Sequence, residues 1–126
     1  MVNFSGDGCY MMHGQELATA VQHKAGVIFI VVNNGSYGTI RMHQERRFPG
    51  RVSATDLQNP DFVKLAEAYG AAGYRVTQTS EFAPALKAAL VNTLAGQPAL
   101  IEIVLDVEAL TPRQTLSQIR AAAQKS

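Results

Sequence analysis

The chain has 126 residues, of which 47% are hydrophobic and 17% are charged, a composition typical of one soluble globular domain. The 11 Lys and Arg nearly balance the 10 Asp and Glu, so the basic excess of a dedicated nucleic-acid binder is absent. A single Cys rules out an internal disulfide, and the sequence shows no signal peptide or membrane-spanning run. We therefore expect a cytoplasmic protein that binds neither nucleic acid nor a membrane.

Apolar runs and periodicity predict strands and helices in alternation along the chain. In chain order, we expect a strand at 2–5, a helix at 11–23, a strand at 27–32, helices at 37–48 and 61–69, a strand at 74–77, a helix at 80–95, a strand at 98–105 and a helix at 112–124. Ser80 is the expected N-cap of the helix at 80–95, and Pro112 the expected first residue of the last helix.

The order of these elements predicts the fold class. The run at 27–32 has no polar alternation, which is typical of a strand covered on both faces in a parallel sheet. Alternating strands and helices indicate an α/β fold, a doubly wound and mostly parallel sheet with helices on both faces. The chain begins almost on its first strand, which fits either a natural start or the cut end of a longer fold that lacks its N-terminal elements here.

Two predicted loops follow strands and carry candidate functional residues. Gly6-Asp7-Gly8 follows the first strand, and Asn33-Asn34-Gly35-Ser36 follows the second. A right-handed crossover brings both strand ends to the same edge of a parallel sheet, where ligands bind. The glycines permit close approach of the backbone to a ligand, and the N-terminus of the next helix offers N–H groups to a phosphate.

Both loops also contain hard oxygen atoms. Asp7 supplies a carboxylate, Asn34 supplies a side-chain carbonyl, and the following turn supplies a backbone carbonyl. Mg²⁺ prefers oxygen ligands and keeps several positions for phosphate and water. Either motif alone is common in turns, but their joint placement after two buried strands is more specific. We therefore expect a magnesium ion that bridges a diphosphate to the protein.

These residues resemble a known motif. Gly6-Asp7-Gly8, continued through Met12 and Gln15-Glu16-Leu17-Ala18-Thr19 to Asn33-Asn34, is similar to the thiamine diphosphate motif of the acetolactate synthase, pyruvate decarboxylase and benzoylformate decarboxylase superfamily. The resemblance extends to the strand that begins at Pro98. It implies that residues 1–126 are one domain, the C-terminal part of a larger enzyme, and that they bind Mg²⁺ and the diphosphate of thiamine diphosphate.

The resemblance implies a set of site residues. The implied metal ligands are Asp7, the side chain of Asn34 and the carbonyl of Ser36. The implied cofactor contacts are Gly6, Asp7, Gly8, Cys9, Tyr10, His13, Asn34, Ser36, Tyr37 and Gly38. Cys9 stands where family members often have Ser, so either a weaker thiol donor or a backbone N–H alone replaces the hydroxyl donor. His13 fits a plain helix-start residue as well as a cofactor contact.

The resemblance also implies an activity for the larger enzyme. Such enzymes decarboxylate a 2-keto acid and then transfer or release the aldehyde unit, so we expect an acetolactate synthase-like transferase or lyase. The family's catalytic Glu lies in an N-terminal pyrimidine-binding domain. We therefore expect no catalytic residue here, and no activity from these residues alone. The expected partners are the missing N-terminal and middle domains and further copies of the enzyme, in a homodimer or homotetramer.

Other functions stay open. The loop at 33–41 is also close to the benzoylformate decarboxylase pattern, and His43 stands where biosynthetic acetohydroxyacid synthases have a Trp that selects the acceptor. A stand-alone flavodoxin-like or receiver-like module would use Asp7 for regulation, although such modules need no paired amides at the second strand end. The cluster Arg41, Arg46, Arg47 and Arg51 fits a substrate carboxylate, a nucleotide group or a solvated face.

Overall fold

The computed structural model describes residues 1–125 of the chain. Its elements are, in chain order, β1 (Val2–Gly6), α1 (Asp7–His13), α2 (Glu16–Gln22), β2 (Ile28–Asn33), α3 (Gly38–Arg47), α4 (Phe62–Ala68), β3 (Ala72–Val76), α5 (Thr79–Leu94), β4 (Ala99–Val104) and α6 (Leu116–Ala123). Within residues 1–125, no helix is long and apolar enough to cross a membrane.

The chain folds into two compact units. The first comprises Met1–Asn33 and Asn59–Val104 and contains the whole sheet. The second comprises Asn34–Gln58 and the chain from Leu105 onward, with α3 and α6. The chain passes from one unit to the other at three places, and the first of these lies between two consecutive asparagines, Asn33 and Asn34.

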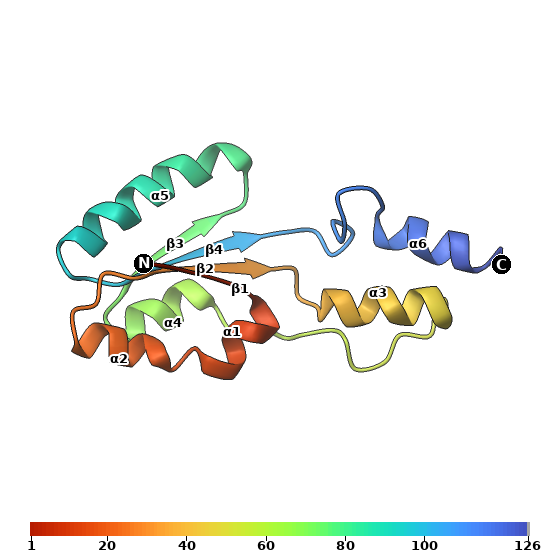
Figure 1. The fold of residues 1–126 in the computed structure, drawn as a ribbon, viewed down its shortest axis with the longest axis horizontal. Helices are drawn as coiled ribbons and strands as arrows, with labels where there is room; N and C mark the ends of the chain where they lie inside the picture. The colour runs from red at the N-terminus through yellow and green to blue at the C-terminus, as the bar shows by residue number, and fades with distance from the viewer. Residues whose placement is uncertain (126) are drawn as a thin grey trace. The chain divides into compact units, whose positions relative to one another are not determined.

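The first unit is built on a four-stranded parallel sheet with the strand order β1-β2-β4-β3 (Figure 1). Gly6 lies opposite Val32, and Asn33 lies opposite Val104, so the strands end along one edge of the sheet. The edge strand β1 leaves Val2 and Phe4 exposed, at 57% and 70% of their surface. The α/β class and the parallel sheet are as the sequence predicted.

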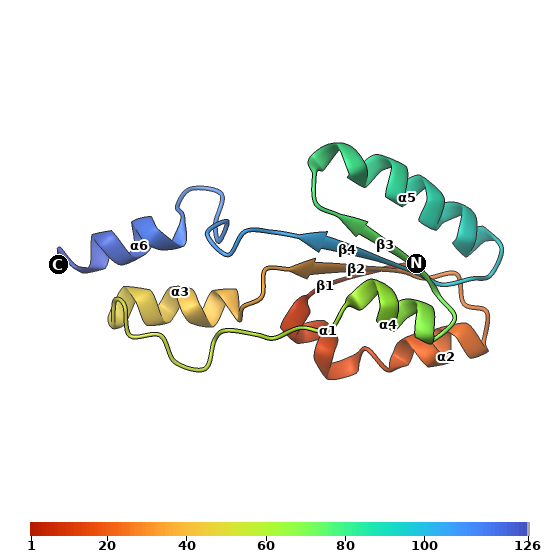
Figure 2. The ribbon, with the colours of Figure 1, turned by 180° about the vertical axis from the view of Figure 1, so that it is seen from behind.

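Helices cover both faces of this sheet, because the side chains of β2 alternate between two apolar clusters. Val31 packs with Tyr10, Leu17 and Phe62 on the face covered by α1, α2 and α4. Ile28 and Ile30 belong to the cluster on the opposite face, which α5 covers (Figure 2). Burying an aliphatic side chain of this size contributes roughly 1.5–3 kcal/mol, so both faces stabilise the unit. This explains the absence of polar alternation in β2.

The helix expected at 11–23 is in fact two helices, which corrects the prediction. α1 begins at Asp7, directly after the strand, and ends at His13, while α2 begins at Glu16. Gly14 lies between them, and a Cβ added there would be 2.8 Å from the Cε1 atom of the buried Tyr10 ring. His13 therefore lies in the last turn of α1, not in a first turn as expected.

Two predicted helix starts are also wrong. Helix α5 begins at Thr79 with Gln78 as its N-cap, because the Glu81 carboxylate accepts hydrogen bonds from the backbone N–H groups of Thr77 and Gln78. Helix α6 begins at Leu116, several residues after Pro112. Its N-cap is Thr115, whose hydroxyl accepts from the backbone N–H of Gln118, so a complete capping box fixes the start.

Candidate functional site

Asp7 stands at the junction of β1 and α1, in the first unit. Only 3% of Asp7 is exposed, and its Oδ1 atom accepts a 2.8 Å hydrogen bond from the backbone N–H of Gly8. Gly6 caps the helix in an extended conformation, and a Cβ added to it would meet no atom within 4 Å. A buried carboxylate is thus held at the start of a helix, beside a residue with open space next to it.

A side-chain amide joins this carboxylate to the end of the neighbouring strand. The Nδ2 atom of Asn59 donates to Asp7 Oδ2 at 2.7 Å and to Asn33 Oδ1 at 2.9 Å. Asn33 is the last residue of β2, which pairs directly with β1. The ends of the first two strands are therefore adjacent, as the sequence predicted from a strand–helix–strand crossover.

The hydrogen bonds continue across the sheet edge to β4 and β3. Asn33 Nδ2 donates to Glu102 Oε1 at 2.7 Å, and Arg75 Nε donates to Glu102 Oε2 at 2.8 Å. Arg75 also donates to Asp61, the N-cap of α4, at 2.6 Å. Glu102 is only 3% exposed and raises the pKa of Arg75, to which Asp61 also contributes. The buried carboxylate is thus paired with a cation, as burial of charge requires.

The loop after Asn33 belongs to the second unit and is shaped by its own hydrogen bonds. Asn34 Oδ1 accepts from the backbone N–H of Ser36 at 3.1 Å, a local turn that asparagine favours. Ser36 is 4% exposed, and its hydroxyl donates to the Thr55 carbonyl at 2.9 Å. The backbone N–H of Tyr37 donates to the same carbonyl at 2.9 Å. These contacts hold Asn34, Ser36 and Tyr37 in one ordered turn.

Gly35 and Gly38 give this turn its shape. Gly35 has a φ of +64°, a conformation that favours glycine, and its carbonyl accepts from the backbone N–H of Leu57 at 2.8 Å. The carbonyl of Ser36 accepts from the backbone N–H of Gly38 at 2.8 Å. A Cβ added at Gly38 would lie 3.1 Å from the side-chain nitrogen of Asn34. A larger residue at position 38 would therefore disturb the Asn34 side chain.

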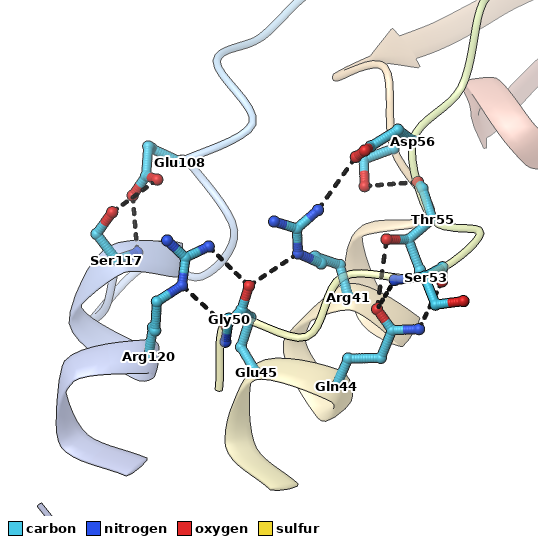
Figure 3. A network of polar contacts seen from close by, with 11 residues as sticks. Arg41, Gln44, Glu45, Gly50, Ser53, Thr55, Asp56, Glu108, Ser117 and Arg120 are labelled. Carbon is cyan, nitrogen blue, oxygen red and sulfur yellow. Dashed lines mark hydrogen bonds and ion pairs between the residues drawn. The ribbon is translucent and has the colours of Figure 1, made fainter. Parts of the chain in front are cut away.

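Helix α3 follows this turn and carries a buried ion cluster (Figure 3). Glu45 is 1% exposed and accepts from Arg41 Nε at 3.0 Å and from Arg120 of α6 at 2.7 and 2.9 Å. Arg41 also donates to Asp56 at 3.1 Å. Hydrogen bonds from Arg120, and then from Gly50 and Arg41, outweigh burial and lower the pKa of Glu45 to about 2. Arg41 is therefore a buried structural cation, not part of a solvated basic face.

The other predicted site residues differ in how far they are buried. Gly8 is buried in the first turn of α1, whereas Cys9 and His13 are exposed. The Tyr10 side chain lies in the core, edge-on to Phe62 with ring centroids 5.6 Å apart. No described residue hydrogen-bonds its hydroxyl, and burial, aided by Tyr69, raises the pKa of Tyr10 to about 12. His43 is exposed on α3.

Sequence reasoning missed three polar residues of the first unit, namely Asn59, Arg75 and Glu102. Asn59 lies 52 residues from Asp7 in the chain, within a segment that had no local pattern beyond that of a loop. Glu102 did carry a signal, because it is the only charged residue in the apolar run at 98–105. Within residues 1–125, no cluster of three or more His, Cys, Asp or Glu could hold a metal ion.

Comparisons with known proteins show the family to which the chain is similar. The chain at residues 1–103 matches the family described as "Thiamine pyrophosphate enzyme, C-terminal TPP binding domain". It is 36% identical over 109 residues to the acetolactate synthase large subunit of Corynebacterium glutamicum, covering 82% of this chain and 17% of that protein. It is also 36% identical over 106 residues to the acetolactate synthase of Bacillus subtilis, covering 84% of this chain and 18% of the relative.

Solved structures show the same likeness. A thiamine diphosphate-dependent 4-hydroxybenzoylformate decarboxylase from Rhodococcus jostii superposes with a TM-score of 0.75 at 35% identity, over 83% of this chain and 19% of that one. The benzoylformate decarboxylase of Polynucleobacter necessarius gives a TM-score of 0.77 at 31% identity, over 88% and 20%. The chain thus spans about a fifth or less of the relatives it matches. On these grounds, the chain belongs to the family of C-terminal thiamine pyrophosphate-binding domains of thiamine pyrophosphate enzymes.

Proposed function

We propose that this chain is one domain that binds Mg²⁺ and the diphosphate of thiamine diphosphate within a longer enzyme. The observation that carries this proposal is the buried carboxylate of Asp7 at the start of α1, joined through Asn59 to Asn33. Asn34, the next residue in the chain, supplies the second oxygen in a turn that also contains the Ser36 carbonyl. One carboxylate and two neutral oxygens suit Mg²⁺, whose other positions phosphate and water would fill.

The chain's residues have separate roles in this proposal. Asp7, the Asn34 side chain and the Ser36 carbonyl would hold the metal. Gly6 would leave room for the diphosphate, because a Cβ there meets nothing within 4 Å. Gly8, whose N–H donates to Asp7, would lie beside the phosphates. The backbone N–H groups of Cys9 and Tyr10 would face them, as is common at helix N-termini. The core position of the Tyr10 ring restricts this residue to a backbone role.

Three further predicted contacts are retained. Tyr37 and Gly38 border the ordered turn of Asn34, which would place them beside the cofactor. His13 is exposed at the end of α1, so it would contact the cofactor through its side chain. Bound thiamine diphosphate would supply the carbanion chemistry, while these residues would bind and orient it.

For the whole enzyme we propose an acetolactate synthase-like reaction, decarboxylation of a 2-keto acid followed by transfer or release of the aldehyde unit. The likeness to acetolactate synthases supports it, and the likeness to benzoylformate decarboxylases supports the alternative, simple decarboxylation. His43, in place of an acceptor-selecting Trp, favours this alternative. The partners would be the enzyme's other domains and a second subunit, in the cytoplasm, and these residues alone would be inactive.

Substitution of Asp7 tests the proposal. Asp7→Asn in the full-length enzyme removes the negative charge but keeps the shape of the side chain. We expect the apparent affinity for Mg²⁺ and for thiamine diphosphate, measured by equilibrium dialysis, to fall by at least tenfold. The control is Glu67→Gln, at an exposed position of α4 that is distant from Asp7 in the sequence. It makes the same change of charge. Unchanged affinities in Asp7→Asn would refute the magnesium assignment.

A further inference from the structure

A directed series of hydrogen bonds runs along the edge of the sheet to Asp7. It begins at the Arg75 guanidinium and passes through Glu102, Asn33 and Asn59, all within the first unit. The four distances between successive side chains are 2.8, 2.7, 2.9 and 2.7 Å. Each strand of the sheet is thereby tied to its neighbour at the end where Asp7 lies.

The charges at the two ends fix the direction of every bond in this series. The Glu102 carboxylate accepts from Arg75 at one oxygen, and Asn33 turns its Nδ2 toward the other oxygen as a second donor. The Oδ1 atom of Asn33 must then face Asn59, which has to donate. The two hydrogens of one amide nitrogen suffice for both bonds of Asn59, one to Asn33 and one to Asp7. If the Asn59 amide were flipped, its oxygen would face the acceptor oxygens of Asp7 and Asn33, and both hydrogen bonds would be lost.

We propose that Asn59 is the positioning residue of the metal site, which fixes the orientation of the Asp7 carboxylate without touching the metal. This inference rests on the proposed function. Gly8 donates to Oδ1 and Asn59 donates to Oδ2, so the carboxylate is held at both oxygens. Orientation of a ligand by such outer partners commonly changes metal affinity by 10–100-fold.

The test is Asn59→Ala in the full-length enzyme. We expect the apparent dissociation constant for Mg²⁺, measured by equilibrium dialysis at saturating thiamine diphosphate, to rise by about 10–100-fold. We expect kcat at saturating Mg²⁺ to stay within about twofold of the parent, because Asn59 takes no part in the reaction. The exposed neighbour Gln58→Ala is the matched control, with both values unchanged. Asn59→Leu, which keeps the shape of the side chain and removes both donors, serves if the Ala variant does not fold.

The outcomes separate this inference from the proposed function. If Asn59→Ala binds Mg²⁺ as tightly as the parent while Asp7→Asn does not, Asn59 has no positioning role and the inference is wrong. It is equally wrong if excess Mg²⁺ fails to restore kcat and the metal-free variant melts well below the parent, because Asn59 then only supports the fold. If Asp7→Asn itself binds Mg²⁺ normally, the proposed function fails first.

Discussion

Arg120 of α6 donates two hydrogen bonds to the carboxylate of Glu45 in α3, from Nε at 2.9 Å and from Nη2 at 2.7 Å. Such bidentate pairs are the strongest ion pairs that arginine makes, and here Glu45 is almost fully buried. Arg41 binds the same carboxylate from within α3. One carboxylate therefore pairs with two guanidinium groups that come from distant parts of the chain.

Removal of this acid should destabilise the second unit. In Glu45→Ala, the Arg41 side chain, which is 10% exposed, would keep only the largely exposed Asp56 as a counter-charge. We expect a loss of roughly 3 kcal/mol, as when one partner of a buried ion pair is removed. Native-state hydrogen exchange of the α3 and α6 amides measures it. The exposed Arg46→Ala on the same helix should change nothing, and equal protection in both variants would contradict the prediction.

The same cluster predicts a dependence of stability on pH. The pKa of Glu45 is lowered from 4.5 to about 2 by Arg120, Gly50 and Arg41, so the folded state binds its proton more weakly than the unfolded state. Its contribution is then fully present above about pH 4.5 and is lost as the pH falls toward 2. We expect the difference in unfolding free energy between the parent and Glu45→Gln to shrink over that range. A constant difference would show that Glu45 has an ordinary pKa.

The buried hydroxyl of Tyr10 is a second source of measurable stability. Among residues 1–125 it has no hydrogen-bond partner, and an unsatisfied buried polar group costs about 1–3 kcal/mol. We expect Tyr10→Phe to raise the melting temperature, measured by calorimetry. Tyr74→Phe is the matched comparison, because the Tyr74 hydroxyl donates to Asn92 at 2.6 Å and its loss should lower the melting temperature. Destabilisation by both changes would argue for an internal partner of Tyr10.

Substitution by alanine should destabilise the protein at one glycine, Gly26, and leave its stability unchanged at another, Gly6. A Cβ at Gly26 would stand 2.4 Å from the carbonyl oxygen of Thr93, so Gly26→Ala forces the backbone apart and should cost about 1–3 kcal/mol in denaturant titrations. Gly6→Ala meets no atom and should leave the stability of the cofactor-free protein unchanged. If the proposed site is correct, Gly6→Ala should instead weaken the binding of thiamine diphosphate. Tight binding by Gly6→Ala would remove Gly6 from the site.

The sequence predicted the order and type of the elements well, because unbroken apolar runs such as that of β2 are strong signals. It failed at helix ends, where single hydrogen bonds decide. Thr115 with Gln118, not Pro112, starts α6. The strand-end position of Asp7 followed from topology alone. The role of Asn59 could not be predicted, because it depends on a contact with Asp7, 52 positions away, that no local pattern encodes.

The edge strand β1 has consequences for handling the chain on its own. Its outer N–H and C=O groups form a ready template for another strand, and Val2 and Phe4 add exposed apolar surface beside them. Preparations of these residues alone should self-associate through this strand as concentration rises. A lysine in place of Phe4 is the substitution that would keep such a sample monodisperse.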